Sequence, residues 1–502
     1  MPTYDIGLEH VSLAFATKTI FTDVTQGVFE GDRIGIVGRN GDGKSTLLHL
    51  FRGTQEPDSG RVTKRGGLTF GMLDQRDPLD DGATIREAAL EGRADYEWAS
   101  DNTSREIVEA LLGGMSLDAK IGSLSGGQRR RADLARLLLK DWDILALDEP
   151  TNHLDVDAIH WLEDFLLDFE GTVIVVSHDR HFLNNVCTHI VDIDYGKVQI
   201  YVGNYEFWYE SSQMVQRMIR DQNRKNEEKI KELQNFIQRF SANKSKSRQA
   251  TSRKKLIEKL TVEELPASSR RYPWVGFTMD REAGKDILEV KGISKTIDGV
   301  KVLNDVSFIV RKGDKIGFIS ENELATTTLF QILMGEMEPD EGTFKWGVST
   351  SQSYFPKDNS EFFNGHTENM LDWLAPYSKD TLESTLRGFL GRMLFSGNDV
   401  YKPVNVLSGG EKVRMMLSRM MLFGSNVLVI DQPTNHLDLE SITAVNNGVA
   451  DFKGNVLLAT HDHEFMNTIA NRIIELREDG VLDKECTYDE FLEFRSQYQK
   501  RA

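Results

Sequence analysis

Cysteine, long apolar runs and positive charge are scarce in this sequence. The two cysteines, Cys187 and Cys486, form no C-x-x-C pair, so neither a disulfide framework nor a zinc or iron–sulfur site is indicated. The apolar runs, such as residues 172–176, are far shorter than a membrane span, and the N-terminus has no secretory-type segment. We therefore expect a protein of the reducing cytoplasm that does not cross a bilayer.

The net charge of −18 over 502 residues is unevenly distributed. An acidic chain of this kind favours solubility and argues against nucleic acid as a partner of the whole chain. Residues 211–275 are the exception, because they contain 16 Lys and Arg against 7 Asp and Glu, a local charge of +9. The length by itself predicts two to four domains of about 100–200 residues each.

A phosphate-binding loop stands near the N-terminus. Residues 38–45 fit the pattern G-x-x-x-x-G-K-[ST] without a mismatch, between a predicted strand at 34–37 and a helical pattern at 45–51. Glycine leaves backbone N–H groups open to phosphate, Lys44 supplies charge to the β and γ phosphates, and Ser45 offers a hydroxyl to Mg²⁺. The predicted nucleotide-binding residues of the loop are Gly38, Asn40, Gly41, Gly43, Lys44, Ser45 and Thr46.

Two acids and a histidine follow later strand patterns. One apolar run ends at Asp148, a candidate Mg²⁺ ligand together with Ser45, and at Glu149, which we expect to polarise the attacking water. His178 follows the next run, and we predict that it contacts the γ-phosphate in a catalytic role. Gln75 is a weaker candidate for a nucleotide-site residue that binds magnesium and water, because isolated glutamines usually lie on the surface.

The sequence repeats itself at an offset of 282 to 283 residues. The repeat is clearest in three pairs of segments, 32–37 with 314–319, 124–128 with 407–411, and 148–155 with 431–438. Short apolar runs alternate with helical patterns in both copies, as in a mostly parallel sheet covered on both faces, and the runs include 144–147, 173–176, 427–430 and 456–458. We predict two tandem α/β domains at 1–205 and 286–502, joined by a basic helical linker at 206–285.

The linker pattern predicts a helical hairpin with a positively charged tip. Residues 204–240 have apolar positions near helical spacing, a second helix is expected from about Ser247, and the basic turn 241–248 lies between them. A solvated helix face is the ordinary explanation of such charge. A basic segment between two acidic domains nevertheless favours contact with a phosphate backbone. The candidate RNA contacts are Lys244, Lys246, Arg248, Arg253, Lys254 and Lys255.

Together these motifs resemble the ABC-F class of ATP-binding cassette proteins, near a bacterial, YbiT-like branch. The resemblance rests on Leu-Ser-Gly-Gly-Gln at 124–128, Asp-Glu-Pro-Thr-Asn-His-Leu-Asp at 148–155 and Ser-His-Asp at 177–179, with counterparts in the second copy. It implies two ABC-type P-loop NTPase domains, ATP and Mg²⁺ as cofactors, and a ribosome-associated ATPase whose linker enters the exit site near the peptidyl tRNA. Members of the class act as translation factors or protect ribosomes from antibiotics.

The resemblance also implies that the two domains close head to tail, with each ATP between one phosphate loop and the Leu-Ser-Gly-Gly element of the other copy. A serine hydroxyl and bare glycine N–H groups at a helix N-terminus suit a phosphate. The first site would then add Phe15, for adenine stacking, with Ser408, Gly409 and Gly410, and the second would use Ser125, Gly126 and Gly127.

The second copy departs from the nucleotide-binding pattern. Lys44 is matched by Thr326, which removes a charge-assisted contact worth about 1.5–3 kcal/mol, and Glu149 is matched by Gln432, which cannot accept a proton. We therefore predict that the first site hydrolyses ATP and that the second binds nucleotide weakly or not at all. The residues of this degenerate second site are Asn322, Thr326, Thr327, Asp431, Gln432 and His461.

Two other functions stay open. A soluble ATPase component of a membrane transporter would need a partner permease and would leave the basic linker idle, and a binding-only regulator would have lost turnover. We favour a monomer with an intramolecular pair of cassettes that contacts rRNA and peptidyl tRNA and no membrane.

Overall fold

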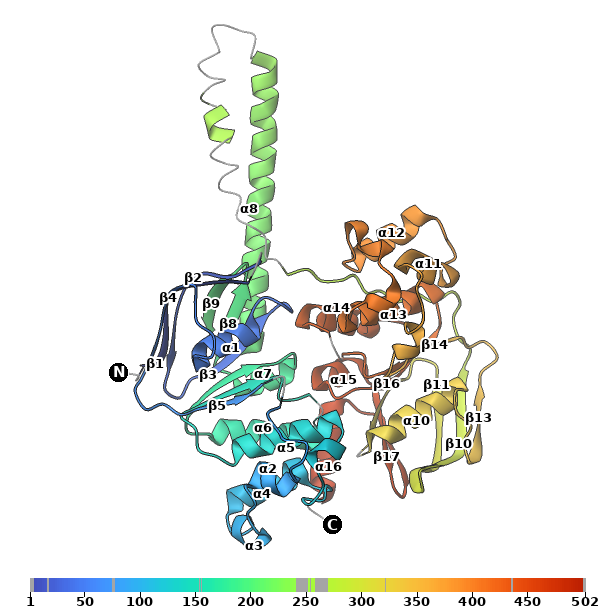
Figure 1. Cartoon of the computed structure of the whole chain (residues 1–502). Helices are drawn as coiled ribbons and strands as arrows, with labels where there is room; N and C mark the ends of the chain where they lie inside the picture. The colour runs from blue at the N-terminus through green and yellow to red at the C-terminus, as the bar shows by residue number, and fades with distance from the viewer. Residues whose placement is uncertain are drawn as a thin grey trace. The chain divides into compact units, whose positions relative to one another are not determined.

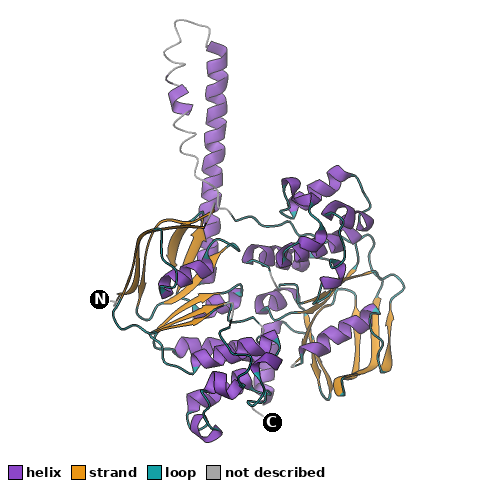
Figure 2. Ribbon diagram, viewed as in Figure 1, coloured by secondary structure: helices purple, strands orange, loops and turns teal. Residues whose placement is uncertain are grey.

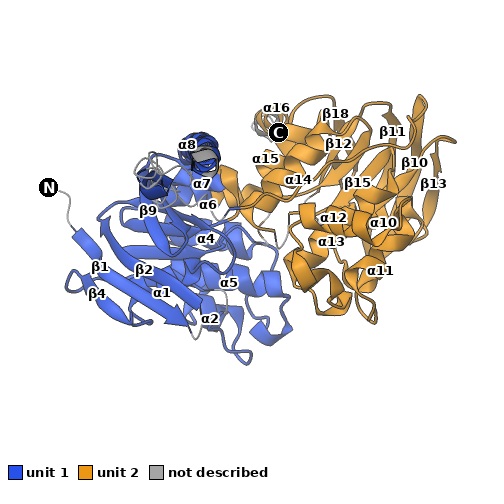
Figure 3. Cartoon of the chain, turned by 90° about the horizontal axis from the view of Figure 1, so that it is seen from above, with its two compact units in different colours: residues 1–152, 162–177, 182–270 blue, residues 153–161, 178–181, 271–502 orange. Residues whose placement is uncertain are grey.

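The computed structural model describes residues 4–15, 18–74, 77–152, 154, 156–240, 252, 254–257, 270–320, 322–434 and 437–499. The chain divides into two compact units. Unit 1 comprises residues 1–152, 162–177 and 182–270, and unit 2 comprises residues 153–161, 178–181 and 271–502 (Figure 3). Each unit is described by itself.

A six-stranded sheet forms the centre of unit 1, with the strand order β5-β6-β7-β3-β8-β9. Neighbouring strands are parallel except β8 and β9, which pair antiparallel. β6 and β7 are buried along their whole length, which explains why their apolar runs do not alternate. The α/β class and the predicted strands are confirmed. The bounds are β3 Arg33–Gly38, β5 Phe70–Leu73, β6 Ile144–Asp148, β7 Thr172–Val176, β8 His189–Asp194 and β9 Lys197–Val202.

Three further strands of unit 1 form an antiparallel sheet that the sequence analysis did not predict. β1 (Tyr4–Phe15) pairs with β2 (Lys18–Phe29) and with β4 (Ser59–Lys64). Bulges interrupt the β1–β2 register, so the strict alternation that signals a half-buried strand is lost. Apolar residues of this sheet, of the central sheet and of α1 (Lys44–Arg52) share one core, which fixes the helix that follows the phosphate loop.

Helices occupy the segment between β5 and the Leu-Ser-Gly-Gly element (Figure 2). They are α2 Ile85–Leu90, α3 Asp95–Trp98, α4 Asn102–Leu112 and, beginning within that element, α5 Gly126–Leu138. α6 (Val156–Asp168) and α7 (Arg180–Val186) follow β6 and β7 along the chain.

The first linker helix, α8 (Tyr205–Phe240), has the extent predicted for it, and Figure 1 shows it as one long helix. Its first turns are fixed to unit 1, because the buried Trp208 donates from Nε1 to Asp192 Oδ2 (3.2 Å) and Arg270 pairs with the same carboxylate. Residues 254–257 form a short helical stretch in which the side chains of Lys254 and Lys255 are exposed. The tip candidates Lys244, Lys246, Arg248 and Arg253 lie outside the described residues.

Unit 2 repeats the two-sheet architecture. Its six-stranded sheet has the order β14-β15-β16-β12-β17-β18, and its antiparallel sheet has the order β11-β10-β13. The strands are β10 Asp286–Ile297, β11 Val300–Arg311, β12 Lys315–Ser320, β13 Glu341–Trp346, β14 Gln352–Phe355, β15 Val427–Asp431, β16 Asn455–Ala459, β17 Arg472–Arg477 and β18 Gly480–Lys484. The α-helices are α10 Glu323–Met334, α11 Met370–Leu374, α12 Glu383–Arg392, α13 Gly409–Phe423, α14 Leu439–Asp451, α15 His463–Ile469 and α16 Tyr488–Gln499.

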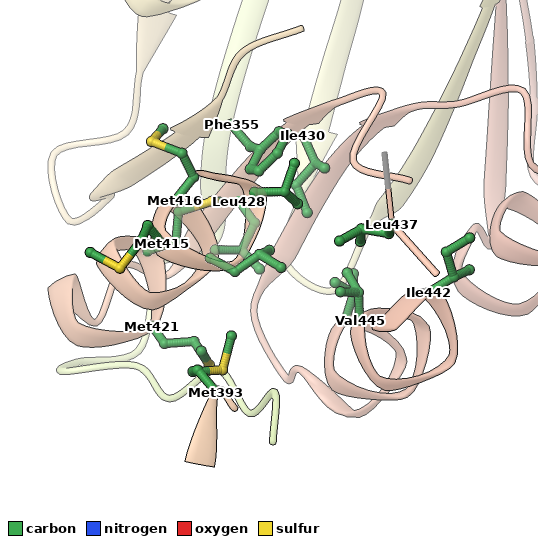
Figure 4. Packing of buried hydrophobic residues seen from close by; sticks show 14 of the residues in the cluster. Phe355, Met393, Met415, Met416, Met421, Leu428, Ile430, Leu437, Ile442 and Val445 are labelled. Carbon is green, nitrogen blue, oxygen red and sulfur yellow. The ribbon is translucent and has the colours of Figure 1, made fainter. Parts of the chain in front are cut away.

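Methionine is prominent in the larger core of unit 2. Figure 4 shows Met415 and Met416, both on α13, near Phe355 of β14 and near Leu428 and Ile430 of β15. All five side chains are buried in one apolar cluster. The helix that begins in the second Leu-Ser-Gly-Gly element therefore packs against the central sheet through apolar contacts at these positions.

Candidate functional site

The first phosphate loop has a backbone that requires glycine. It joins β3, which ends at Gly38, to α1, which begins at Lys44. Gly41 and Gly43 have φ angles of 85° and 102° in the left-handed region. A Cβ atom at Gly43 would also lie 2.4 Å from Cγ2 of Ile20. Neither position accepts a larger residue without strain.

Lys44 and Ser45 are held at the start of α1. The buried Lys44 ammonium donates to the carbonyl of Gly38 (2.9 Å) and to Oδ1 of Asn40 (3.2 Å), so it curls back over the loop. The Ser45 hydroxyl donates to Asp148 Oδ2 (2.6 Å). The loop, its lysine and the acid at the end of β6 therefore form one cluster, with the half-buried Thr46 next on the helix.

Asp148 is a buried carboxylate with an oxygen neighbour. Burial raises its pKa, while the hydrogen bond from Ser45 and the charges of Lys44 and Arg130 lower it. A hydroxyl and a carboxylate oxygen at this distance are the hard ligands that Mg²⁺ prefers, so Ser45 and Asp148 fit the predicted metal site. Gln75, the third predicted ligand, lies outside the described residues.

Glu149 leaves β6 in an uncommon conformation. Its φ angle is 52°, in the left-handed region, and its N–H donates to the carbonyl of Val176 at the end of β7 (2.7 Å). His178 follows two residues beyond Val176 and is half-buried. Because β6, β7 and β3 are parallel neighbours, their carboxyl ends meet at one edge of the sheet, where ligands bind in such folds.

The end of the β1–β2 hairpin supplies an aromatic ring and a lysine. Phe15, the predicted adenine-stacking residue, is the last residue of β1, and its side chain is 47% exposed. It pairs in register with Lys18, whose ammonium donates to the carbonyl of Gly41 in the phosphate loop (2.6 Å). The sequence analysis missed Lys18, because a single lysine in a strand carries no motif.

Both Leu-Ser-Gly-Gly elements form exposed helix N-termini. Ser125 is the N-cap of α5 and Ser408 is the N-cap of α13, and each serine forms a capping box with the residue three positions later. The following glycines, Gly126, Gly127, Gly409 and Gly410, form the first turns of these helices. Each element thus presents a hydroxyl and glycine backbone at the positive end of a helix.

The loop of the second copy is helical where the first is a phosphate loop. α10 begins at Glu323, which matches Gly41, so this helix starts three residues earlier than α1 does. Asn322 caps it by accepting from Leu324 N–H at its side chain (3.0 Å) and from Ala325 N–H at its carbonyl (2.8 Å). Backbone N–H groups that would face a phosphate are therefore bonded within the protein.

Other features of the first site persist in the second copy. The Thr327 hydroxyl donates to Asp431 Oδ2 (2.7 Å), as Ser45 does to Asp148. Gln432 has a φ angle of 51°, and its N–H donates to the carbonyl of Ala459 (2.8 Å). Thr326 is buried in α10, and His461 is half-buried after β16. The backbone at the end of the strand is therefore retained, although Thr326 and Gln432 stand where cassette 1 has Lys44 and Glu149.

Comparison with known proteins supports the resemblance. Residues 21–152 and 303–435 match the ABC transporter family model, and residues 191–274 match another model with the same description. The chain is 53% identical to the uncharacterized ABC transporter ATP-binding protein YkpA of Bacillus subtilis (strain 168), over 97% of both chains. It is 35% identical to the probable ATP-binding protein YbiT of Escherichia coli O157:H7, over 96% of this chain and 98% of YbiT.

A third relative is the energy-dependent translational throttle protein EttA of Escherichia coli (strain K12), 32% identical over 95% of this chain and 93% of EttA. Among solved structures, a complex of the archaeal ribosomal stalk protein aP1 with the archaeal ribosome recycling factor aABCE1 matches with a TM-score of 0.69 at 19% identity. That match covers 96% of this chain and 92% of the other, and it shows the fold.

The chain belongs to the ATP-binding cassette family. Within it the chain is a member of the ABC-F class, as the motifs predicted, and its similarity to YbiT agrees with the predicted branch. Cassette 1 and cassette 2 denote the first and second copies from here on. Membership of this class implies nucleotide-binding domains and ATPase activity. Among the described residues, no helix is long and apolar enough to cross a membrane.

Proposed function

We propose that this protein is a ribosome-associated ATPase that hydrolyses ATP at one competent site, built on the phosphate loop of cassette 1. The observation that carries the proposal is the contrast between the two loops. Cassette 1 has left-handed glycines and a buried lysine, whereas α10 of cassette 2 extends through the equivalent residues. Only the first arrangement leaves a loop that can surround a phosphate.

The residues of cassette 1 divide the chemistry of hydrolysis among them. Lys44 and the loop N–H groups bind the phosphates, and Ser45 and Asp148 hold Mg²⁺, which supplies charge neutralisation when bound. Glu149 orients the attacking water and accepts its proton, and His178 contacts the γ-phosphate. Phosphoryl transfer depends mainly on positioning and on charge, so this set of groups is sufficient.

The cassettes close on ATP, with the exposed N-terminus of α13 completing the competent site. Ser408 and its glycines retain the hydroxyl and the capped helix start even though cassette 2 has lost its own loop. This retention supports a role in the site of cassette 1. Cassette 2 then acts as a partner that binds its own nucleotide weakly or not at all.

The basic linker is the proposed contact with rRNA and peptidyl tRNA at the exit site. The relative EttA is named as a translational throttle, and α8 is a long helix fixed at its base to cassette 1. The exposed Lys254 and Lys255 provide an accessible test. Replacing both by Glu should weaken ribosome binding. The slope of the logarithm of the binding constant against the logarithm of salt concentration should also become less steep, by about one unit for each phosphate that the linker no longer neutralises.

Cosedimentation with 70S ribosomes tests the function as a whole. Glu149→Gln should remain on ribosomes in the presence of ATP, because closure occurs and hydrolysis does not follow. Adding Lys44→Ala to the same chain should release it, since ATP no longer binds. Equal ribosome occupancy of wild type and Glu149→Gln would contradict the proposal, and ATPase activity stimulated by a membrane partner would favour a transporter motor instead.

A further inference from the structure

Arg130, in the first half of α5, is a charged residue without a role in the proposed chemistry. Its guanidinium donates hydrogen bonds to the backbone carbonyls of Asp74 and Asp148. Each of these carbonyls belongs to the peptide group that joins it to the following residue, and the following residues are Gln75 and Glu149. One side chain of α5 therefore contacts the main chain leading into two of the predicted site residues.

The peptide group between Asp148 and Glu149 is held on both sides. Its N–H donates to the carbonyl of Val176, and its carbonyl accepts from Arg130. The left-handed conformation that follows is strained for a residue with a side chain. These two bonds restrain the main chain from which the Glu149 side chain extends.

Cassette 2 shows that the turn forms without the arginine. Gln432 has the same left-handed φ angle as Glu149, and its N–H makes the equivalent bond to Ala459. The residue that matches Arg130 at the offset of 283 is Val413, which is 4% exposed and packs in the apolar core. Arg130 is thus not required for the backbone conformation.

Cassette 2 also lacks a second charged residue of α5, Asp133. Asp133 is the strongest charge partner of Arg130, is fully buried, and pairs with Arg136 (2.7 Å). Its match in cassette 2 is Met416, which packs in the core shown in Figure 4. At these two positions α5 therefore carries a half-buried arginine and a buried aspartate, and α13 carries two buried apolar residues.

We infer that Arg130 is a positioning residue for ATP hydrolysis in cassette 1, which ties α5 to the carbonyls of Asp74 and Asp148 and so holds the main chain that leads into Glu149. The inference rests on the proposed function of Glu149. A displacement of about 1 Å in a reacting group can cost 10²-fold in rate. Because Arg130 acts through the main chain, it changes turnover and leaves nucleotide affinity intact.

The chain itself supplies a variant that separates this role from folding. Arg130→Val with Asp133→Met reproduces the apolar pair of cassette 2, so no buried carboxylate loses its partner. We expect kcat to fall about 10- to 100-fold, with KM for ATP within twofold of wild type. Arg130→Gln should behave alike, and Arg130→Lys should retain part of kcat because its ammonium can still donate to one carbonyl.

Arg129→Gln is the matched control. Arg129 precedes Arg130 on α5, but its guanidinium pairs with Asp77 (2.7 Å) and Asp81, away from the acids of the site. This variant should keep the kcat of wild type. A kcat within twofold of wild type in the double variant, or an equal loss in Arg129→Gln, would overturn the inference.

Hydrogen exchange distinguishes failure of this inference from failure of the proposed function. If wild type does not hydrolyse ATP, the proposed function fails. The hydrogen bonds of Arg130 to the carbonyls of Asp74 and Asp148 still predict a change in amide exchange when the arginine is replaced in the nucleotide-free protein. The amide of Glu149 should exchange at least 10-fold faster in Arg130→Gln than in wild type or Arg129→Gln. An equal exchange rate of the Glu149 amide in all three proteins would overturn the positioning role of Arg130, whatever their ATPase activity.

Discussion

The two cassettes share a sheet order and differ in the few residues between a central strand and the following helix. In cassette 1 the chain forms a loop with two left-handed glycines before α1 begins at Lys44. In cassette 2 the equivalent residues are the first turn of α10, capped by Asn322. The fold of a cassette therefore does not depend on its phosphate loop, and the loop is present for the nucleotide.

What cassette 2 has kept supports the same conclusion. It retains the bond from a hydroxyl on the helix to the acid at the strand end, the left-handed residue after that acid, and the capped helix start at Ser408. It lacks counterparts of Lys44, of the Glu149 carboxylate and of the half-buried Arg130. The features held in common stabilise the fold or an exposed helix start, and the features confined to cassette 1 are those to which we assign a part in the proposed hydrolysis.

The largest expected effect comes from giving each cassette the residue that the other has at the position of Glu149 and Gln432. Glu149→Gln should lower kcat by 10²- to 10⁴-fold, the usual contribution of a general base. Gln432→Glu should leave kcat within twofold, because cassette 2 lacks the lysine and the loop. Steady-state phosphate release measures both, and a substantial gain from Gln432→Glu would show that cassette 2 still binds ATP productively.

Removing the lysine should break ATP binding in one cassette only. Lys44→Ala eliminates a charge-assisted contact of about 1.5–3 kcal/mol, so affinity should fall about 10- to 150-fold. Thr326→Ala is its counterpart and should leave affinity unchanged. Titration with a fluorescent ATP analogue compares them, and equal losses in the two variants would mean that both loops bind nucleotide.

A single methyl group should distinguish the two loops. Gly43→Ala forces a left-handed alanine against Ile20, so we expect loss of ATP binding and a fall in stability of about 1–2 kcal/mol. Ala325→Gly, at the matching position in α10, should cost only about 0.5–1 kcal/mol and leave ATP binding unchanged. Thermal unfolding with and without ATP measures both effects.

The smallest expected effect concerns the hairpin beside the loop. Lys18→Ala removes the bond to the Gly41 carbonyl, worth about 0.5–1.5 kcal/mol, so ATP affinity should fall about 2- to 12-fold. Val300→Ala, the equivalent change in cassette 2, should have no effect. If Lys18→Ala binds ATP like wild type, the hairpin lysine does not support the loop conformation.

Much of the fold and of the first site could be predicted from the sequence. The buried central strands β3, β6, β7, β15 and β16, the long linker helix and the repeat were predicted because their signals are local, or repeat at a fixed offset. The antiparallel sheets were not, since bulges break the alternation of β1 and β10. The early start of α10 was also missed, although Asn322 followed by Glu, Leu and Ala is a local signal for a capped helix.

The sequence by itself determined that cassette 1 has the residue types of a phosphate loop and that cassette 2 does not, because that pattern needs particular residues at fixed spacing along the chain. Only the tertiary structure decided how those residues are held. Lys18 meets Gly41 across 23 positions, and Arg130 meets Asp74 across 56. Such contacts depend on which strands and helices become neighbours, and no spacing in the sequence indicates that.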